Sequence, residues 1–356
     1  MRPAGLTRRV LLSVAPSVAA IALIFVLTGS TKTMTALRYL QPSYIALLFL
    51  FAGVEVFLDG ARLTLLIRAA DGHITLWGGC RLAAIGAFGN LVTPFSTGGH
   101  VAVVYLLRQQ RVPSGRGTSV VITRLLASGV FVLFGALLSL LFLGHLVSDV
   151  PAIRTMLLVT GVVFLGLSSL AVAALLNPRV LAALGALVGV VLQRAGVVRR
   201  RGRFQNRVNR HVIHARNSFR RFFSTHAEML GGALVYSGLL YATQVMVLWA
   251  VVRALSLATS FGEGVALSAL LIFLLSFVPT PGGAGLGEAL FVLVYSSAVP
   301  THLLGVAVLL WRFFYQYLPA ALGGVLATAY PASLFSPGVD ATSLEEGQRH
   351  GIGGRV

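Results

Sequence analysis

Long stretches without a charged residue recur along this chain, and they constrain its fold more than any other feature. Each has 20 residues or more, enough to cross ~30 Å of hydrocarbon as a helix. These runs are Val10–Gly29, Leu82–Leu107, Leu125–Ser148, Thr155–Pro178, Met229–Val252, Gly264–Gly287 and Phe313–Val339. Only 11% of the residues are charged, whereas globular proteins average about 25%. We therefore predict an all-α polytopic membrane protein.

Basic residues strongly outnumber acidic ones, with 28 Lys and Arg against 10 Asp and Glu and a net charge of +18. Eleven arginines lie between Arg179 and Arg221, and no acid stands between Asp149 and Glu228. An arm that binds single-stranded nucleic acid would interleave such residues with stacking aromatics, which are few here. The positive-inside rule instead predicts a cytoplasmic loop over residues 176–228 that contacts anionic lipid, with no nucleic acid as partner.

Length and charge together predict about six full transmembrane helices within one membrane domain, residues 1–332. The predicted spans are Val10–Gly29, Ser43–Leu66, Thr118–Leu143, Thr155–Leu176, Met229–Val252 and His302–Tyr330. The polar segment 333–356 has the composition of a disordered cytoplasmic tail. This arrangement places both termini in the cytoplasm and the chain in the cell membrane.

The apolar segment Leu76–Leu107 contains a helix breaker at its centre, from Pro94 to Gly98-Gly99. The part before the breaker would rise ~24 Å as a helix and the part after it ~15 Å, so neither half comfortably crosses the hydrocarbon core. If the segment were one full span, the eleven arginines of the later loop would face outward, against the positive-inside rule. We therefore predict a re-entrant helical hairpin that returns to the cytoplasm.

A second apolar segment, Gly264–Val299, is interrupted in a similar way by Pro279-Thr-Pro281-Gly282-Gly283. We predict a second hairpin that enters from the opposite side, because paired interrupted segments are typical of an inverted repeat with a site at the midplane. Each tip would aim free backbone N–H groups at an anion. The alternative is that the glycines only allow close helix packing. The residues assigned to an anionic lipid headgroup at the tips are Asn90, Pro94, Gly98, Gly99, Pro281, Gly282 and Gly283.

Charged residues inside predicted spans are costly and usually face a pathway. Arg124 lies ~12 Å into the bilayer by helical rise, and its alternative is to snorkel to the inner surface. Glu288 and Arg312 both fall near mid-depth, so we predict that they pair, either as a structural contact or with a role in gating or substrate binding. All three are candidate headgroup residues.

Two carboxyls lie within the second predicted span. Glu55 and Asp59 are four residues apart, so they would repel each other if both were ionised. Arg62 is expected to neutralise Asp59. Both acids are candidate proton or charge sites, and Glu55 is the better candidate for a proton-accessible carboxyl.

The remaining features give little support for an enzyme or a metal site. The single Cys80 excludes an intrachain disulfide and a Cys-based metal site. His211 and His214 stand among arginines that repel a cation. The sequence has no Walker A, HExxH or GxSxG motif, and its predicted outer loops are too short for a catalytic domain. We assign no catalytic residue, no metal and no cofactor.

Two motifs resemble signatures of a known family. They are Phe88-Gly89-Asn90-Leu91-Val92-Thr93-Pro94 with Gly98-Gly99, and the stretch from Phe277 to Glu288. Across residues 8–332 the chain resembles the lysylphosphatidylglycerol synthase transmembrane region, a flippase-like family that includes the membrane half of the multiple peptide resistance factor. The resemblance implies that a lipid, such as an aminoacylated phosphatidylglycerol, is moved between leaflets.

The resemblance also bears on single residues. Family members typically carry arginine where Arg124 and Arg312 stand, and Asp59 is similar to an acid in the second span of relatives. Relatives often place acids beside the first arginine, whereas this chain has Thr123 and Ser128, which argues against a charge-paired Arg124. Bifunctional members carry an aminoacyl-transferase domain after the membrane region, so this chain is not expected to aminoacylate lipid by itself.

Our leading hypothesis is a lipid flippase or related transporter that holds the headgroup at the hairpin tips while the acyl chains stay in the bilayer. Its substrate would be an anionic or aminoacylated phospholipid or a lipid-linked intermediate. The alternatives are a non-transporting scaffold for a lipid-modifying enzyme and a membrane glycosyl- or phospho-transferase. Expected partners are the lipid substrate, anionic lipid at the arginine-rich loop, and a second copy of the chain or a lipid-modifying enzyme.

Overall fold

The computed structural model describes residues 40–109, 114–147 and 227–328, with short stretches between 18 and 26 and between 162 and 183. Every regular element in the three long ranges is helical, in agreement with the predicted all-α fold. The elements are α3 (Pro42–Ala69), α4 (Leu76–Leu91), η1 (Pro94–Ser96), α5 (Gly98–Gln109), α6 (Ser114–Val147), α10 (Ala227–Ala254), α11 (Phe261–Leu275), η2 (Pro281–Gly283), α12 (Leu286–Tyr295), η3 (Thr301–Leu303), α13 (Leu304–Arg312), a π-helical turn η4 (Phe313–Tyr317) and α14 (Leu318–Thr328).

Four helical segments of the described ranges are long and apolar enough to cross a membrane. They are Pro42–Ala69, Arg116–Ser139, Glu228–Ala254 and Thr301–Ala327, and they match four of the predicted spans. The predicted spans Val10–Gly29 and Thr155–Leu176 and the arginine-rich loop lie mostly outside the described residues, and the tail lies wholly outside them. These predictions therefore stay as they are. The chain is thus an all-α polytopic membrane protein.

The described helices form two halves with the same order of elements. Each half runs from a 28-residue helix (α3 or α10) to a shorter one (α4 or α11), a broken turn, a short helix and a final long segment. The shorter helices even begin alike, because Thr75 and Ser260 both cap them by accepting a backbone N–H bond, at 3.1 and 3.2 Å.

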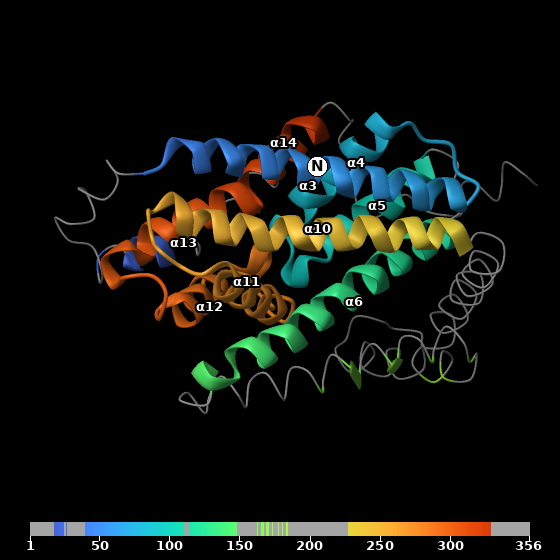
Figure 1. Ribbon diagram of the computed structural model, residues 1–356. Helices are drawn as coiled ribbons and strands as arrows, with labels where there is room; N and C mark the ends of the chain where they lie inside the picture. The colour runs from blue at the N-terminus through green and yellow to red at the C-terminus, as the bar shows by residue number, and fades with distance from the viewer. Residues whose placement is uncertain are drawn as a thin grey trace, which may run out of the picture.

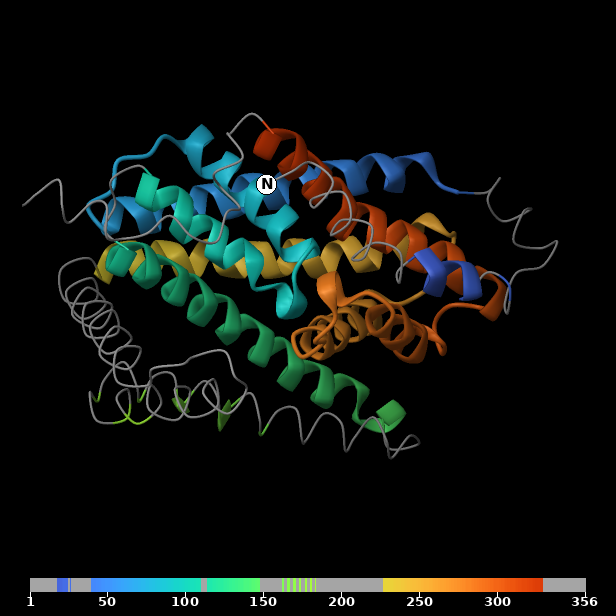
Figure 2. The same cartoon turned by 180° about the vertical axis from the view of Figure 1, so that it is seen from behind.

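The two halves are inverted with respect to each other. Helices α3 and α10 run side by side in opposite directions (Figure 1), and the Gln41 N–H at the start of α3 donates to the Ala254 carbonyl at the end of α10, at 3.0 Å. The α4–α5 hairpin enters from one end of the bundle and the α11–α12 hairpin from the other, as views from both sides show (Figures 1 and 2). The predicted pair of oppositely inserted hairpins is therefore present.

The hairpin tips share one backbone conformation and contact each other. Thr93 and Thr280 are extended, and the prolines that follow them begin η1 and η2. The next residue is left-handed in both tips, with φ 53°, ψ 20° at Phe95 and φ 57°, ψ 16° at Gly282. Proline lacks an N–H and a left-handed residue breaks the helical path, so both segments stop inside the bundle.

The distribution of polarity is the reverse of that in a soluble protein. Within the described ranges five charged side chains are buried, each with at most 9% of the residue exposed: Asp59, Arg62, Arg124, Glu288 and Arg312. Large apolar side chains such as Phe57, Phe134 and Val235 are at least half exposed on the outer faces of α3, α6 and α10. An apolar exterior around a charged interior fits a bundle whose solvent is lipid.

Candidate functional site

A cavity of about 360 Å³ lies where the two halves meet. Its lining comes from α3, α4, α6, α10, α11 and both hairpin tips. The final long segment of the second half, Thr301–Ala327, also contributes to it. The charged residues in the lining are Glu55, Asp59, Arg62, Arg124 and Arg312. Three arginines and two carboxyls inside an apolar bundle make this cavity a place where the protein can hold a polar group within the membrane.

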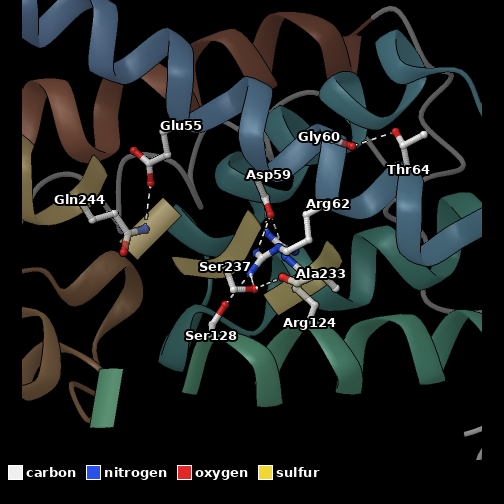
Figure 3. A network of polar contacts seen from close by, with 10 residues as sticks. All are labelled: Glu55, Asp59, Gly60, Arg62, Thr64, Arg124, Ser128, Ala233, Ser237 and Gln244. Atoms are coloured by element: carbon white, nitrogen blue, oxygen red, sulfur yellow. Dashed lines mark hydrogen bonds and ion pairs between the residues drawn. The ribbon is translucent and has the colours of Figure 1, made fainter. Parts of the chain in front are cut away.

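Asp59 is the centre of the largest charged cluster in the cavity (Figure 3). Arg62, one turn further along α3, lies 2.6 Å from Asp59 Oδ1, as predicted. Arg124 comes from α6 and donates its Nε to the same oxygen at 3.1 Å, while its Nη2 bonds the second carboxylate oxygen. One carboxylate therefore faces two guanidinium groups, and the cluster has an excess of positive charge.

Hydroxyl groups from two other helices complete this cluster. Arg62 Nη1 donates to Ser128 Oγ of α6 at 2.6 Å and to Ser237 Oγ of α10 at 2.9 Å (Figure 3). Arg124 Nη1 is buried and has no hydrogen-bond partner among the described residues. A buried guanidinium donor without an acceptor is energetically costly, so it favours binding of an anion from outside the protein.

The structure contradicts both sequence-based arguments against a paired Arg124. The side chain does not snorkel to the surface, since 9% of the residue is exposed and it contacts Asp59. The resemblance argued against pairing because Thr123 and Ser128 replace the acids beside this arginine in relatives. The acid comes from α3 instead, and Ser128 binds Arg62. The partner of Arg124 is therefore distant in sequence and is brought close by the packing of α3 against α6.

Glu55 lies one turn before Asp59 and is held separately from the charged cluster (Figure 3). Its Oε1 accepts a hydrogen bond from Gln244 Nε2 of α10 at 3.0 Å. Its Oε2 is buried without a hydrogen-bond partner in the described part of the chain. The cavity thus has a free carboxylate oxygen as well as a free guanidinium nitrogen.

The predicted pair of Glu288 and Arg312 is present, with 2.8 Å between Oε1 and Nε. Arg312 also donates to the carbonyls of Gly282 and Gly283, at 2.8 Å each, and bonds Gln316 Oε1. Glu288 Oε2 accepts the Gly285 N–H at 2.7 Å. The pair therefore fastens the second hairpin tip to the final long segment.

The prediction of free amide groups at the first tip is wrong. The Gly98 N–H donates to Thr93 Oγ1 at 2.7 Å, and the Gly99 N–H donates to Asn90 Oδ1 at 2.9 Å. The next two amides bond the Thr97 carbonyl. At the second tip Gly282 and Gly283 turn their carbonyls toward Arg312, so that tip offers acceptors to a cation. The unpaired positive donors of the cavity among the described residues are therefore on side chains, at Arg124 Nη1 and Arg62 Nε, and not at the first tip.

Close packing explains the glycines of the first tip better than anion binding does. A methyl group on Gly89 would lie 2.8 Å from the Gly99 nitrogen, so the arms of the hairpin touch through backbone. Of the tip residues assigned to a headgroup, those that line the cavity are Asn90, Gly282 and Gly283, and those that do not are Pro94, Gly98, Gly99 and Pro281. Glu288 does not line it either. The role of all these residues in lipid binding stays a prediction.

The sequence was also compared with known proteins. It matches the family described as the lysylphosphatidylglycerol synthase TM region over residues 10–323. The chain belongs to this family. A comparison with curated proteins gave no match. The family relates the protein to lipid modification or transport in membranes.

The match to the lysylphosphatidylglycerol synthase TM region includes both hairpins and the whole cavity lining. It also includes the cluster around Asp59 and the pair of Glu288 and Arg312. The sequence analysis identified the charged residues of that lining and Asn90, but it missed the other uncharged polar ones. Those that bond charged side chains are Ser128, Ser237, Gln244 and Gln316. Isolated polar residues in apolar spans were the available signal, because membrane helices use them to contact one another.

Proposed function

We propose that this protein is a lipid transporter of the flippase type, which moves a phosphate-bearing headgroup through the cavity. The observation that carries the proposal is the buried Arg124 Nη1, which lacks a protein partner among the described residues and belongs to a side chain that lines the cavity between two inverted halves. Arginine suits phosphate because its planar, permanently charged guanidinium offers several donors at once. An anionic or aminoacylated phospholipid and a lipid-linked intermediate all carry such a phosphate, so the proposal covers phosphate-bearing lipids as a class.

The inverted halves supply a means of moving such a headgroup. In transporters built from inverted repeats, one half rocks against the other around a fixed site near the midplane. Here Asp59, Arg62 and Arg124 connect α3 to α6 and α10, while Arg312 and Glu288 fasten the second hairpin. A phosphate that binds Arg124 competes with Asp59 and loosens the first cluster. The acyl chains stay in the surrounding lipid throughout.

We place the protein in the cell membrane with both termini in the cytoplasm. In this orientation the arginine-rich loop, residues 176–228, contacts the anionic lipid of the inner leaflet, which attracts basic segments. The α4–α5 hairpin then enters the membrane from the cytoplasmic side, and the α11–α12 hairpin enters it from the outer side. No catalytic step is part of the proposal.

Reconstitution into liposomes tests the proposal directly. Purified protein is incorporated with a trace of phospholipid that carries a fluorophore on an acyl chain, and an impermeant quencher reports the label that reaches the outer leaflet. The wild type is expected to move the lipid without any partner. Arg124→Gln is expected to slow movement about tenfold or more, because a charge-assisted hydrogen bond to phosphate is worth about 1.5–3 kcal/mol.

Arg81→Gln is the matched control, because Arg81 is exposed on α4 and stacks over Trp77 outside the cavity. Its rate should equal that of the wild type. A folded wild-type protein that moves no lipid would contradict the proposal and favour the scaffold. Consumption of a lipid-linked donor in detergent would favour the transferase.

A further inference from the structure

Glu55 lies in the cavity, and the proposed transport of a phosphate gives it no role. Gln244 occupies one of its oxygens and leaves Oε2, which is buried, without a partner in the residues that the structure describes. A carboxylate oxygen is only an acceptor, so it needs a donor. The missing partner is therefore a donor or a cation that the described residues do not supply.

Aromatic side chains line the same cavity as Glu55. They include Tyr241 of α10 and Tyr315 of the π-helical turn. The Tyr241 hydroxyl is buried and has no hydrogen-bond partner in the described ranges. Aromatic faces attract ammonium groups through their quadrupole, and a carboxylate adds direct charge pairing. These three residues have the composition of an ammonium site.

The charge balance of the cavity points the same way. Glu288 neutralises Arg312, which leaves Arg62 and Arg124 against Asp59 and Glu55 in the lining. The net charge of these four residues is zero when Glu55 is ionised. A net-anionic headgroup would add an uncompensated charge to a buried site, which is costly, whereas a zwitterion would not.

The two acids of the cavity lie one helical turn apart, which suits one small headgroup. Glu55 and Asp59 are four residues apart on α3, a rise of about 6 Å, and Asp59 holds Arg124. An ethanolamine headgroup separates its phosphate from its primary ammonium by two carbons. We infer that Glu55, Tyr241 and Tyr315 form an ammonium subsite, and that the substrate is a zwitterionic phospholipid of the ethanolamine type with its phosphate on Arg124.

This inference rests on the proposed lipid transport, so the experiment has to separate the two. Liposomes of constant composition receive the same acyl-labelled lipid with an ethanolamine, a glycerol or a choline headgroup. The wild type is expected to move the ethanolamine lipid about tenfold faster than the glycerol lipid, because only the ammonium can make a charge-assisted hydrogen bond to Glu55. The choline lipid should be intermediate, because its ammonium contacts aromatic faces but donates no hydrogen bond to Glu55.

Glu55→Gln is expected to bring the ratio of ethanolamine to glycerol rates close to one, and Tyr315→Leu to lower it. Glu228→Gln, an exposed acid of the first turn of α10, is the matched control and should keep the wild-type ratio. As a second measurement, a short-chain ethanolamine lipid in detergent should raise the melting temperature of the wild type more than that of Glu55→Gln.

Each other result overturns a stated part of the argument. Equal ethanolamine and glycerol rates in an active wild type would overturn the ammonium subsite and leave the transport proposal standing. If the folded Glu55→Gln variant moved all three lipids more slowly by the same factor, that result would also overturn the ammonium subsite. Absence of movement of any lipid by the folded wild type would overturn the proposed function itself.

Discussion

Arg124 Nε lies 3.1 Å from Asp59 Oδ1, although the two residues are 65 positions apart and belong to different helices. The same carboxylate binds Arg62, whose Nη1 reaches Ser237 on α10. A single acid thereby links α3, α6 and α10 at the wall of the cavity. This relationship makes Asp59 both a structural connector and the group that a bound phosphate has to compete with.

Asp59→Asn is expected to destabilise the protein strongly. The change leaves two buried arginines without a counter-charge, and breaking a buried pair in this way typically costs about 3–5 kcal/mol. Thermal unfolding in detergent measures the effect. Asp71→Asn is the control, because the Asp71 side chain is 63% exposed and its contact with Arg116 is a surface pair worth about 0–1 kcal/mol. Equal melting temperatures for the two variants would contradict the central role of Asp59.

Arg312→Gln is expected to cost more stability than Glu288→Gln. Arg312 bonds two tip carbonyls and Gln316 as well as Glu288, whereas Glu288 has only the arginine and the Gly285 N–H among the contacts described. The double variant should lose less than the sum of the single losses, because the residues interact directly. Melting temperatures and transport rates of the wild type, the two single variants and the double variant form a double-mutant cycle that measures the interaction. Additive losses in folded protein would mean that the residues act separately.

Gly282→Ala is expected to disturb the second hairpin tip. Gly282 has φ 57°, which costs an L-residue about 1–2 kcal/mol, and a methyl group there would lie 2.9 Å from Leu91 Cδ1 of the first hairpin. The variant should therefore melt at a lower temperature and transport more slowly. Gly262→Ala is the control, since nothing lies within 4 Å of the added methyl and Gly262 is in the first turn of α11. A Gly282 variant as stable as this control would be inconsistent with the tight contact between the tips.

The topology is tested with single cysteines at Ser114 and Ser218 in a Cys80→Ser background. Cys80 is buried, and its removal leaves no other thiol. Both new cysteines should resist an impermeant thiol reagent in intact cells and react after permeabilisation. Ala258→Cys, in the exposed turn between α10 and α11 at the other end of the bundle, should react in intact cells. Labelling of both cytoplasmic positions from outside would overturn the re-entrant assignment of Leu76–Leu107.

Local features of the sequence were enough to predict the architecture. Pro94 and Pro281 interrupt apolar segments that are too short on either side to cross a membrane, and this follows from chain geometry alone. The pairing of Glu288 with Arg312 was also predictable, because two opposite charges at similar depth in lipid have few other partners. Membership of the family came from the motifs around the same two breakers.

The identity of the polar contacts was decided only by the tertiary structure. Arg124 has no acid near it in the sequence, and its partner Asp59 arrives because α3 packs against α6. The amides of the first tip were expected to be free, yet Asn90 and Thr93 occupy them after the hairpin folds back on itself. Sequence shows where charges and breaks occur along the chain. Which donor meets which acceptor depends on how the helices pack, and that decides which groups stay open to a ligand.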